Sequence, residues 1–254
     1  MAEEEKIMAH AKKAVQSLTN KNKKWKEKVK DFLFEILIII VAVNITLWFH
    51  NWSDKKHERQ QEKEFLIETR NDLIQIDSSL VQGIRVFQPT LNYYDSAIVQ
   101  LDSNKINAQY LDTNANFLLN SSVLFYDDSR FESFKSSGYL RLIENQELLS
   151  HISQIYISYL PFITNYDKTL FDLRRVDYKN VIGNKTGYFP FTHAVLVSKF
   201  IHQPDVQYHI RYYGNWLNET KGQKQEIIAA VENVIKEIDK ELKDRFNYDV
   251  SSKK

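Results

Sequence analysis

The sequence of 254 residues contains no cysteine, six glycines and four prolines. The absence of cysteine excludes disulfide bonds, thiolate metal sites and cysteine nucleophiles together. If the domain is exported, packing alone must hold its fold, which is more typical of a bacterial envelope than of a eukaryotic ectodomain. So few glycines and prolines leave little turn-forming sequence, which favours long helices over a β-sandwich or a barrel.

Charge and motifs exclude several classes of function. The net charge is +1, so no basic footprint for nucleic acid is present. The chain has no phosphate loop, nucleophile elbow, dinucleotide fingerprint or HExxH motif. We interpret four histidines as surface or hydrogen-bonded residues, because no carboxylates accompany them at ligand spacing: His151, His193, His202 and His209. We therefore expect no metal, no cofactor and no enzymatic activity.

A hydrophobic run from Phe32 to Phe49 is the dominant feature. Its 18 residues include only three polar ones, and this is about the length that crosses a ~30 Å hydrocarbon core as a helix. Trp48 and Trp52 suit the membrane–water interface. The run predicts one transmembrane helix, residues 32–52, retained as an uncleaved signal anchor. The alternative is a buried core helix of a soluble protein, which periodicity alone cannot distinguish.

The flanks of this run predict its orientation. Nine lysines lie between Met1 and Asp31, whereas the other flank balances five basic residues with five acidic ones. Lysine-rich flanks stay in the cytoplasm. We expect a cytoplasmic tail (1–31), the transmembrane helix (32–52), an extracytoplasmic domain (53–249) and a disordered tail (250–254). The predicted location is the inner membrane of a bacterium, with the domain in the periplasm.

The polar residues inside the hydrophobic run are Glu35, Asn44 and Thr46. At 100° per residue Glu35 and Thr46 share a helix face, and Asn44 lies nearly opposite Glu35. Polar side chains in a membrane are costly unless they find a partner, so these three residues are candidates for helix association. Glu35 is near enough to the cytoplasmic end to be simply tolerated, and for Asn44 both interpretations stay open.

Two blocks of sequence carry a resemblance. The first block begins at Glu35, continues through an aliphatic stretch to Asn51 and Trp52, and ends with the polar residues that follow. The second block is FESFKSSGYL at 131–140 followed by LIENQEL at 142–148. Together they resemble a family of uncharacterised single-pass membrane proteins of Bacteroidetes-type bacteria. The chain departs from that family's pattern at Asn44 and Trp48. The resemblance implies an exported helical domain in the cell envelope and supplies no catalytic residues.

Apolar spacing predicts three long helices after the membrane segment. Leu66, Leu73, Leu80 and Phe87 recur every seven residues in a helix from Ser53 to about Asp102, which Pro89 should bend or break. A second helix, N-capped by Asn145, should extend to Tyr178 with a kink at Pro161. A third, of about 40 residues, should start with Asp205 as its N-cap, with a risk of a break near Gly222.

The segments between the predicted long helices have less regular apolar spacing than the helices themselves. Residues 103–128 predict a polar connection with one short helix around Leu111–Leu119, and residues 179–204 predict irregular structure. Ser129 and Glu132 form a capping box, and Gly138 is placed to end the helix that follows. The expected fold class is all-α: an N-terminal transmembrane helix followed by an extramembrane antiparallel bundle of long helices.

An aromatic stripe in the second helix is the candidate ligand or partner face: Tyr156, Tyr159 and Tyr166. Such a stripe is more often core than a binding face. The leading hypothesis is a non-enzymatic, membrane-anchored interaction or scaffold protein of the bacterial envelope, partnered by the lipid bilayer and by itself or another envelope protein. The alternative is a small-molecule sensor that signals through a separate membrane partner. An enzyme is the third hypothesis.

Overall fold

The computed structural model describes residue 12 and residues 25–120, 123–186 and 196–249, and every regular element in these ranges is a helix. The predicted all-α class is confirmed. The chain divides into two compact units, residues 1–62 and 63–254. Helix α2 (Trp25–Ser103) contributes residues to both units. Most of the predicted lysine-rich tail and the predicted tail 250–254 lie outside the described residues.

Apart from residue 12, the described part of the first unit is the beginning of α2, which holds the predicted membrane segment. Eleven of its large apolar side chains between Leu33 and Trp52 are 39–63% exposed, whereas Ile36, Ile38 and Ile39 are half-buried. An 18-residue window of α2 has a mean hydropathy of 2.4, and none of it is buried. By length and composition the helix could cross a membrane. Its exposure argues against the alternative of a buried core helix.

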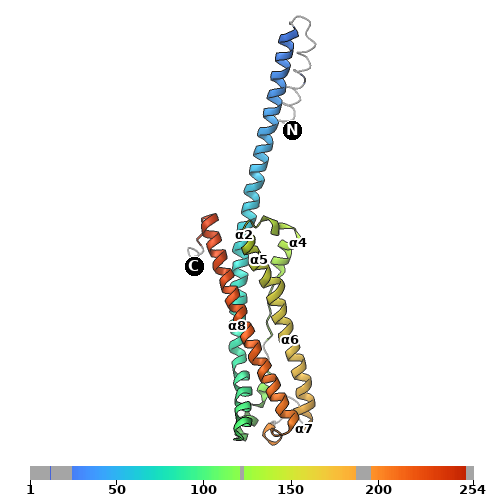
Figure 1. Cartoon of the computed structure of the whole chain (residues 1–254), viewed down its shortest axis with the longest axis vertical. Helices are drawn as coiled ribbons and strands as arrows, with labels where there is room; N and C mark the ends of the chain where they lie inside the picture. Colours follow the sequence, from blue (N-terminus) through green and yellow to red (C-terminus); the bar gives the residue numbers. More distant parts are fainter. Residues whose placement is uncertain (1–11, 13–24, 121–122, 187–195, 250–254) are drawn as a thin grey trace. The chain divides into compact units, whose positions relative to one another are not determined.

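The second unit is a helical bundle built from three long stretches (Figure 1). The first is α2 from residue 63 onward, and the last is α8 (Pro204–Phe246). The middle stretch is one continuous helical run made of α5 (Gln146–Gln154), η3 (Ile155–Tyr159), α6 (Leu160–Asp177), η4 (Tyr178–Gly183) and α7 (Asn184–Thr186).

Polar contacts fix the directions of these helices. Helices α2 and α8 are joined in the order Gln88–Lys221, Asp95–Asn218 and Asp102–Arg211. Helices α6 and α8 are joined in the order Asp167–Lys224 and Asp177–Tyr213. Residue numbers fall along α8 as they rise along each neighbour, so α8 is antiparallel to both. The predicted antiparallel arrangement is confirmed for α8, whereas α2 and α6 run parallel.

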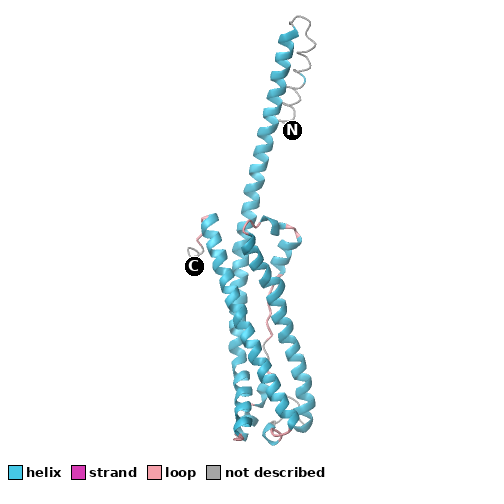
Figure 2. Ribbon diagram, in the orientation of Figure 1, coloured by secondary structure: helices cyan, strands magenta, loops and turns pink. Residues whose placement is uncertain are grey.

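Because α2 and α6 run parallel, residues 104–145 must return the chain along the bundle. They contain α3 (Ala108–Thr113), the 3₁₀ turn η1 (Ala115–Leu118), α4 (Ser129–Ser136) and the 3₁₀ turn η2 (Tyr139–Leu142). The single short helix predicted near 111–119 is therefore two short helices. Residues 123–128 have no regular structure and form the long connection visible in Figure 2. A last 3₁₀ turn, η5 (Val197–Lys199), precedes α8.

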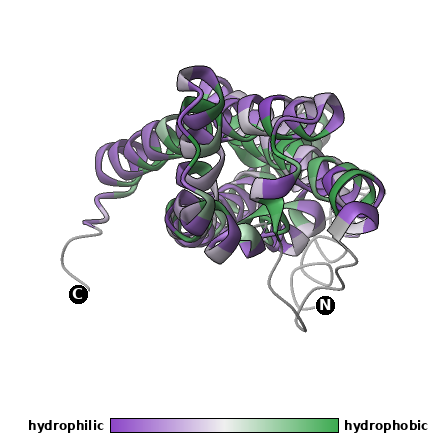
Figure 3. Cartoon of the chain, turned by 90° about the horizontal axis from the view of Figure 1, so that it is seen from below, coloured by the Kyte–Doolittle hydropathy of each residue, from purple (hydrophilic) through white to green (hydrophobic). Residues whose placement is uncertain are grey.

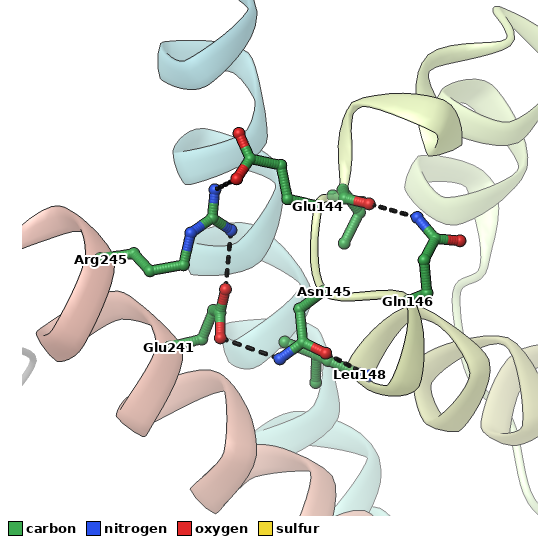
Figure 4. A network of polar contacts seen from close by, with 7 residues as sticks. Glu144, Asn145, Gln146, Leu148, Glu241 and Arg245 are labelled. Carbon is green, nitrogen blue, oxygen red and sulfur yellow. Dashed lines mark hydrogen bonds and ion pairs between the residues drawn. The ribbon is translucent and has the colours of Figure 1, made fainter.

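The helix ends agree in part with the capping predictions. Asn145 caps α5, since its side-chain oxygen accepts a hydrogen bond from the Leu148 N–H at 3.1 Å. The Asn145 amide also donates to Glu241 of α8 at 2.9 Å, and Arg245 joins Glu241 to Glu144 (Figure 4). This network ties the start of α5 to the end of α8.

At the ends of α4 and the start of α8, one predicted cap is confirmed and two are wrong. Gly138 follows α4 with φ +74°, a left-handed conformation that glycine adopts without strain. The Ser129 cap is wrong, because the side-chain oxygen of Asp127 accepts the Ser129 N–H at 2.9 Å instead. Helix α8 begins at Pro204, where the missing N–H and fixed φ suit a first helical turn, so Asp205 is inside the helix.

The long helices tolerate the residues predicted to interrupt them. Helix α2 continues through Pro89 and α8 continues through Gly222, so neither predicted break occurs. Packing along whole helix faces outweighs these local penalties of about 1–3 kcal/mol. At Pro161 the helix changes its winding: η3 is a π-helical turn in which the Leu160 N–H donates to the Ile155 carbonyl, five residues back.

The core of the second unit consists of two apolar clusters. One contains Leu66, Leu73 and Leu80 of α2 with α5 and the C-terminal half of α8; the other contains Leu91 and Tyr94 with the first half of α8. Seen along the bundle, apolar stretches of the helices lie toward its middle (Figure 3). The boundary between the clusters lies where Thr220 and Lys224 interrupt the apolar spacing of α8.

Candidate functional site

A buried ion pair occupies the boundary between the two core clusters. The ammonium of Lys224 in α8 lies 2.8 Å from a carboxylate oxygen of Asp167 in α6, and their side chains are 6% and 4% exposed. The same carboxylate accepts a hydrogen bond from the Leu124 N–H at 3.2 Å, which fastens the segment 123–128 to the bundle. Burial raises the pKa of Asp167, and Lys224 opposes that shift.

Arg174 adds a second buried cation two turns further along α6. It is 1% exposed and donates to the Asn120 carbonyl. Its Nε and Nη1 atoms have no hydrogen-bond partner in the described part of the chain. A cavity of about 10 Å³ lies against Asp167, Arg174, Thr220 and Lys224, roughly the room that one water needs. We call these four residues the polar layer.

A groove opens beside the polar layer. It has a volume of about 390 Å³ and lies between α2 and the segment 123–125, with Lys224 among its lining residues. Ser78, Ser79 and Gln82 supply polar groups along α2, and Phe125, which is 84% exposed, supplies an aromatic ring. Volumes of about 300–1,000 Å³ are typical of small-molecule sites. Sequence reasoning missed this site; its only signal was the polar interruption at Thr220 and Lys224.

The histidine predictions are partly wrong. His151 is hydrogen-bonded as expected, with Nδ1 2.7 Å from Glu237, and His202 is exposed. His209 instead is 1% exposed, and both its ring nitrogens lack a hydrogen-bond partner among the described residues. Burial lowers its pKa to about 4, so the ring is neutral at pH 7. His193 lies outside the described residues.

The three candidate tyrosines are not brought together. Tyr156 is buried in the first core cluster and stacks on Phe131 at 4.7 Å. Tyr159 packs at the edge of that cluster and accepts a hydrogen bond from Gln154. Tyr166, half-buried like Tyr159, contacts Trp216 instead. The π-helical turn between Ile155 and Tyr159 changes the angular positions that a regular helix would have given.

Tyr166 belongs to a chain of ring contacts that the sequence reasoning missed. Successive centroids lie 5.4–5.6 Å apart in the order Phe162, Tyr166, Trp216, Tyr212 and Tyr208. We call these five residues the aromatic ladder. Phe162, Tyr212 and Tyr208 are 41–63% exposed. The available signal was the spacing of four residues between Tyr208, Tyr212 and Trp216, which places them on one face of α8.

Two of the three candidate association residues of the hydrophobic segment have local partners. Asn44 donates to the Ile40 carbonyl at 2.7 Å, and Thr46 donates to the Ala42 carbonyl at 3.0 Å. Glu35 is half-buried. Bonds of this kind satisfy a polar side chain within its own helix. Asn44 and Thr46 therefore have an alternative to a partner helix, and their role in association stays a prediction.

Within the ranges that the structure describes, no group of three or more His, Cys, Asp or Glu side chains could hold a metal ion. The described residues thus offer a buried ion pair, a buried guanidinium, a groove and an exposed aromatic surface. Comparisons with protein-family models, curated proteins and solved structures find no match to this chain.

Proposed function

We propose that the protein is a membrane-anchored, non-enzymatic interaction module of the bacterial envelope. The N-terminal part of α2 would cross the inner membrane, with the lysine-rich tail in the cytoplasm and the helical bundle in the periplasm. The exposed apolar side chains from Leu33 to Trp52 support the anchor, and the lysines before Asp31 support the orientation. Membership of the Bacteroidetes-type single-pass family is part of this proposal.

The observation that carries the interaction role is the aromatic ladder. Exposed rings in contact with one another form an apolar surface at the join of α6 and α8. Tyrosine and tryptophan are the residues that most often dominate binding energy at protein interfaces. The partner would be a second copy of the chain or another envelope protein.

The test removes two exposed rings of the ladder in the full chain, as Tyr208→Ser with Tyr212→Ser. Wild-type protein extracted from membranes in mild detergent should elute as an oligomer or with a co-purifying protein, measured by light scattering and mass spectrometry. The double variant should weaken that association at least tenfold, since interface hot spots contribute about 2 kcal/mol or more each.

Val99→Ser is the matched control, because Val99 is 64% exposed on α2 and lies outside the ladder. It should leave the association unchanged. A wild-type protein that is monomeric and free of partners, or an equal loss in Val99→Ser, would rule out the ladder as the contact surface.

The alternative function, a small-molecule sensor, is favoured by a different observation. The three candidate tyrosines contact different partners, whereas the groove beside Lys224 has a volume in the range of ligand sites. A sensor would use this groove and would signal through a separate membrane partner.

A further inference from the structure

The groove combines one buried cation with a largely uncharged lining. Lys224 is the one charged side chain among its lining residues, which all belong to the described ranges. Val86, Val123 and Phe125 form apolar walls, while Ser79 and Gln82 offer hydroxyl and amide groups. A pocket of this composition suits a small molecule that is apolar along most of its length and polar at one end.

The polar layer behind the groove holds more positive than negative charge. Lys224 and Arg174 both contribute basic side chains, and Asp167 is the single carboxylate lining their shared cavity. On the same helix, Asp172 is exposed, and Asp177, which is half-buried, accepts a hydrogen bond from the Tyr213 hydroxyl at 2.5 Å. Asp167 balances the charge of Lys224, and burying Arg174 without a counter-charge is costly, so an anion brought to the groove side of this layer would stabilise it.

Phe125 provides an independent indication of an occupant. Its ring is 84% exposed, although it follows Leu124, which is buried and held by Asp167. The backbone is thus fixed at this point while a large apolar side chain stands over the groove. A ligand in the groove would cover this ring and remove apolar surface from water.

We propose that the groove binds a small amphipathic carboxylate. Its carboxylate group would lie within hydrogen-bonding reach of the Lys224 ammonium, and its apolar chain would pack against Phe125 and Val86. This site is separate from the aromatic ladder and does not depend on the interaction role proposed above.

The probe is hexanoate, titrated calorimetrically into the full chain in lipid nanodiscs, with empty nanodiscs as the blank. Hexanamide has the same chain without the charge, and inorganic phosphate has charge without the chain. Hexanoate should bind at least tenfold more tightly than either, because a charge-assisted hydrogen bond and apolar burial are both required. Equal binding of hexanoate and hexanamide, or no hexanoate binding at millimolar concentration, would overturn the proposal.

Two variants locate the site. Asp167→Asn with Lys224→Met removes both charges of the buried pair, which avoids leaving one of them unpaired, and should weaken hexanoate binding at least tenfold. Ser79→Leu fills the groove from an exposed position without touching the ion pair and should weaken it similarly. Circular dichroism confirms that each variant is folded.

Lys221→Met is the matched control, because Lys221 lies one turn from Lys224, bonds to Gln88 and does not line the groove. It removes the same charge from the same helix and should leave the affinity unchanged. If it weakens hexanoate binding as much as the double variant, the effect is one of net charge and the groove is not the site. Unchanged binding in both the double variant and Ser79→Leu would lead to the same conclusion.

Discussion

A few buried polar residues interrupt the apolar core of this bundle and mark the place where it could bind a ligand. Thr220 and Lys224 occupy positions of α8 that the apolar spacing would give to core residues, and both are buried. Lys224 is stabilised there by Asp167 from the neighbouring helix. Breaking such a buried pair from one side costs about 3–5 kcal/mol, because it leaves an uncompensated charge. The pair therefore fixes the register of α6 against α8.

His209 is a second buried polar residue, and it makes stability depend on pH. Burial lowers the pKa of the folded-state His209 ring from its ordinary value of 6.5 to about 4; Arg174 lowers it further and Asp177 opposes the shift. His209 binds a proton more readily in the unfolded chain than in the folded one. Its contribution to the free energy of unfolding is therefore fully present above pH 6.5 and is lost as the pH falls toward 4.

We predict that lowering the pH from 7 to 5 costs about 2 kcal/mol through His209 alone. The melting temperature of His209→Leu should therefore fall less between pH 7 and pH 5 than that of the wild type. The difference between the two falls should be about 4–8 °C for a domain of this size. Thermal unfolding followed by circular dichroism measures the difference. His202→Leu, at an exposed position, should behave as the wild type does; an identical pH response in His209→Leu would contradict the prediction.

At the scale of single helices, local sequence and packing compete. Helix α8 contains two glycines with different surroundings. A Cβ atom at Gly222 would meet nothing within 4 Å, whereas one at Gly214 would lie 2.8 Å from Ile98 Cδ1 and 3.4 Å from Tyr94 Cβ. Gly214 thus permits close approach of α2 and α8, and Gly222 has no such role.

These surroundings predict that the two glycines respond differently to substitution by alanine. Gly222→Ala should stabilise the bundle by about 1 kcal/mol through helix propensity and raise the melting temperature by about 2–4 °C. Gly214→Ala should not raise it, because Ile98 must move to make room and that cost offsets the same gain. Circular dichroism on both variants provides the measurement. A similar rise in the two would show that α2 and α8 are not closely packed at Gly214.

At the scale of the whole molecule, topology is the central proposal. The chain has no cysteine, so a single introduced cysteine reports one position without ambiguity. We predict that Val99→Cys reacts with a membrane-impermeant maleimide in cells whose outer layer has been opened, and that Ser17→Cys reacts only after lysis. The reverse pattern would place the bundle in the cytoplasm, and reaction of both would indicate that the chain does not cross the membrane.

The sequence by itself determined the helical class, the apolar segment, and the long helices with their buried apolar faces. These faces include Leu66, Leu73 and Leu80 of α2 and the apolar positions of α8. These follow from composition and periodicity, which act within one element. It also placed the caps at Asn145 and Gly138, because capping depends on residues a few positions apart.

The tertiary structure alone decided which helices run parallel, how the chain returns through residues 123–128, and which polar residues meet. Asp167 and Lys224 are far apart in the sequence, and nothing local pairs them; the antiparallel packing of α6 on α8 does. The same packing assembled the aromatic ladder from two helices and buried His209 with no hydrogen-bond partner among the described residues. Contacts between distant segments depend on the global arrangement of the bundle, which local patterns constrain but do not specify.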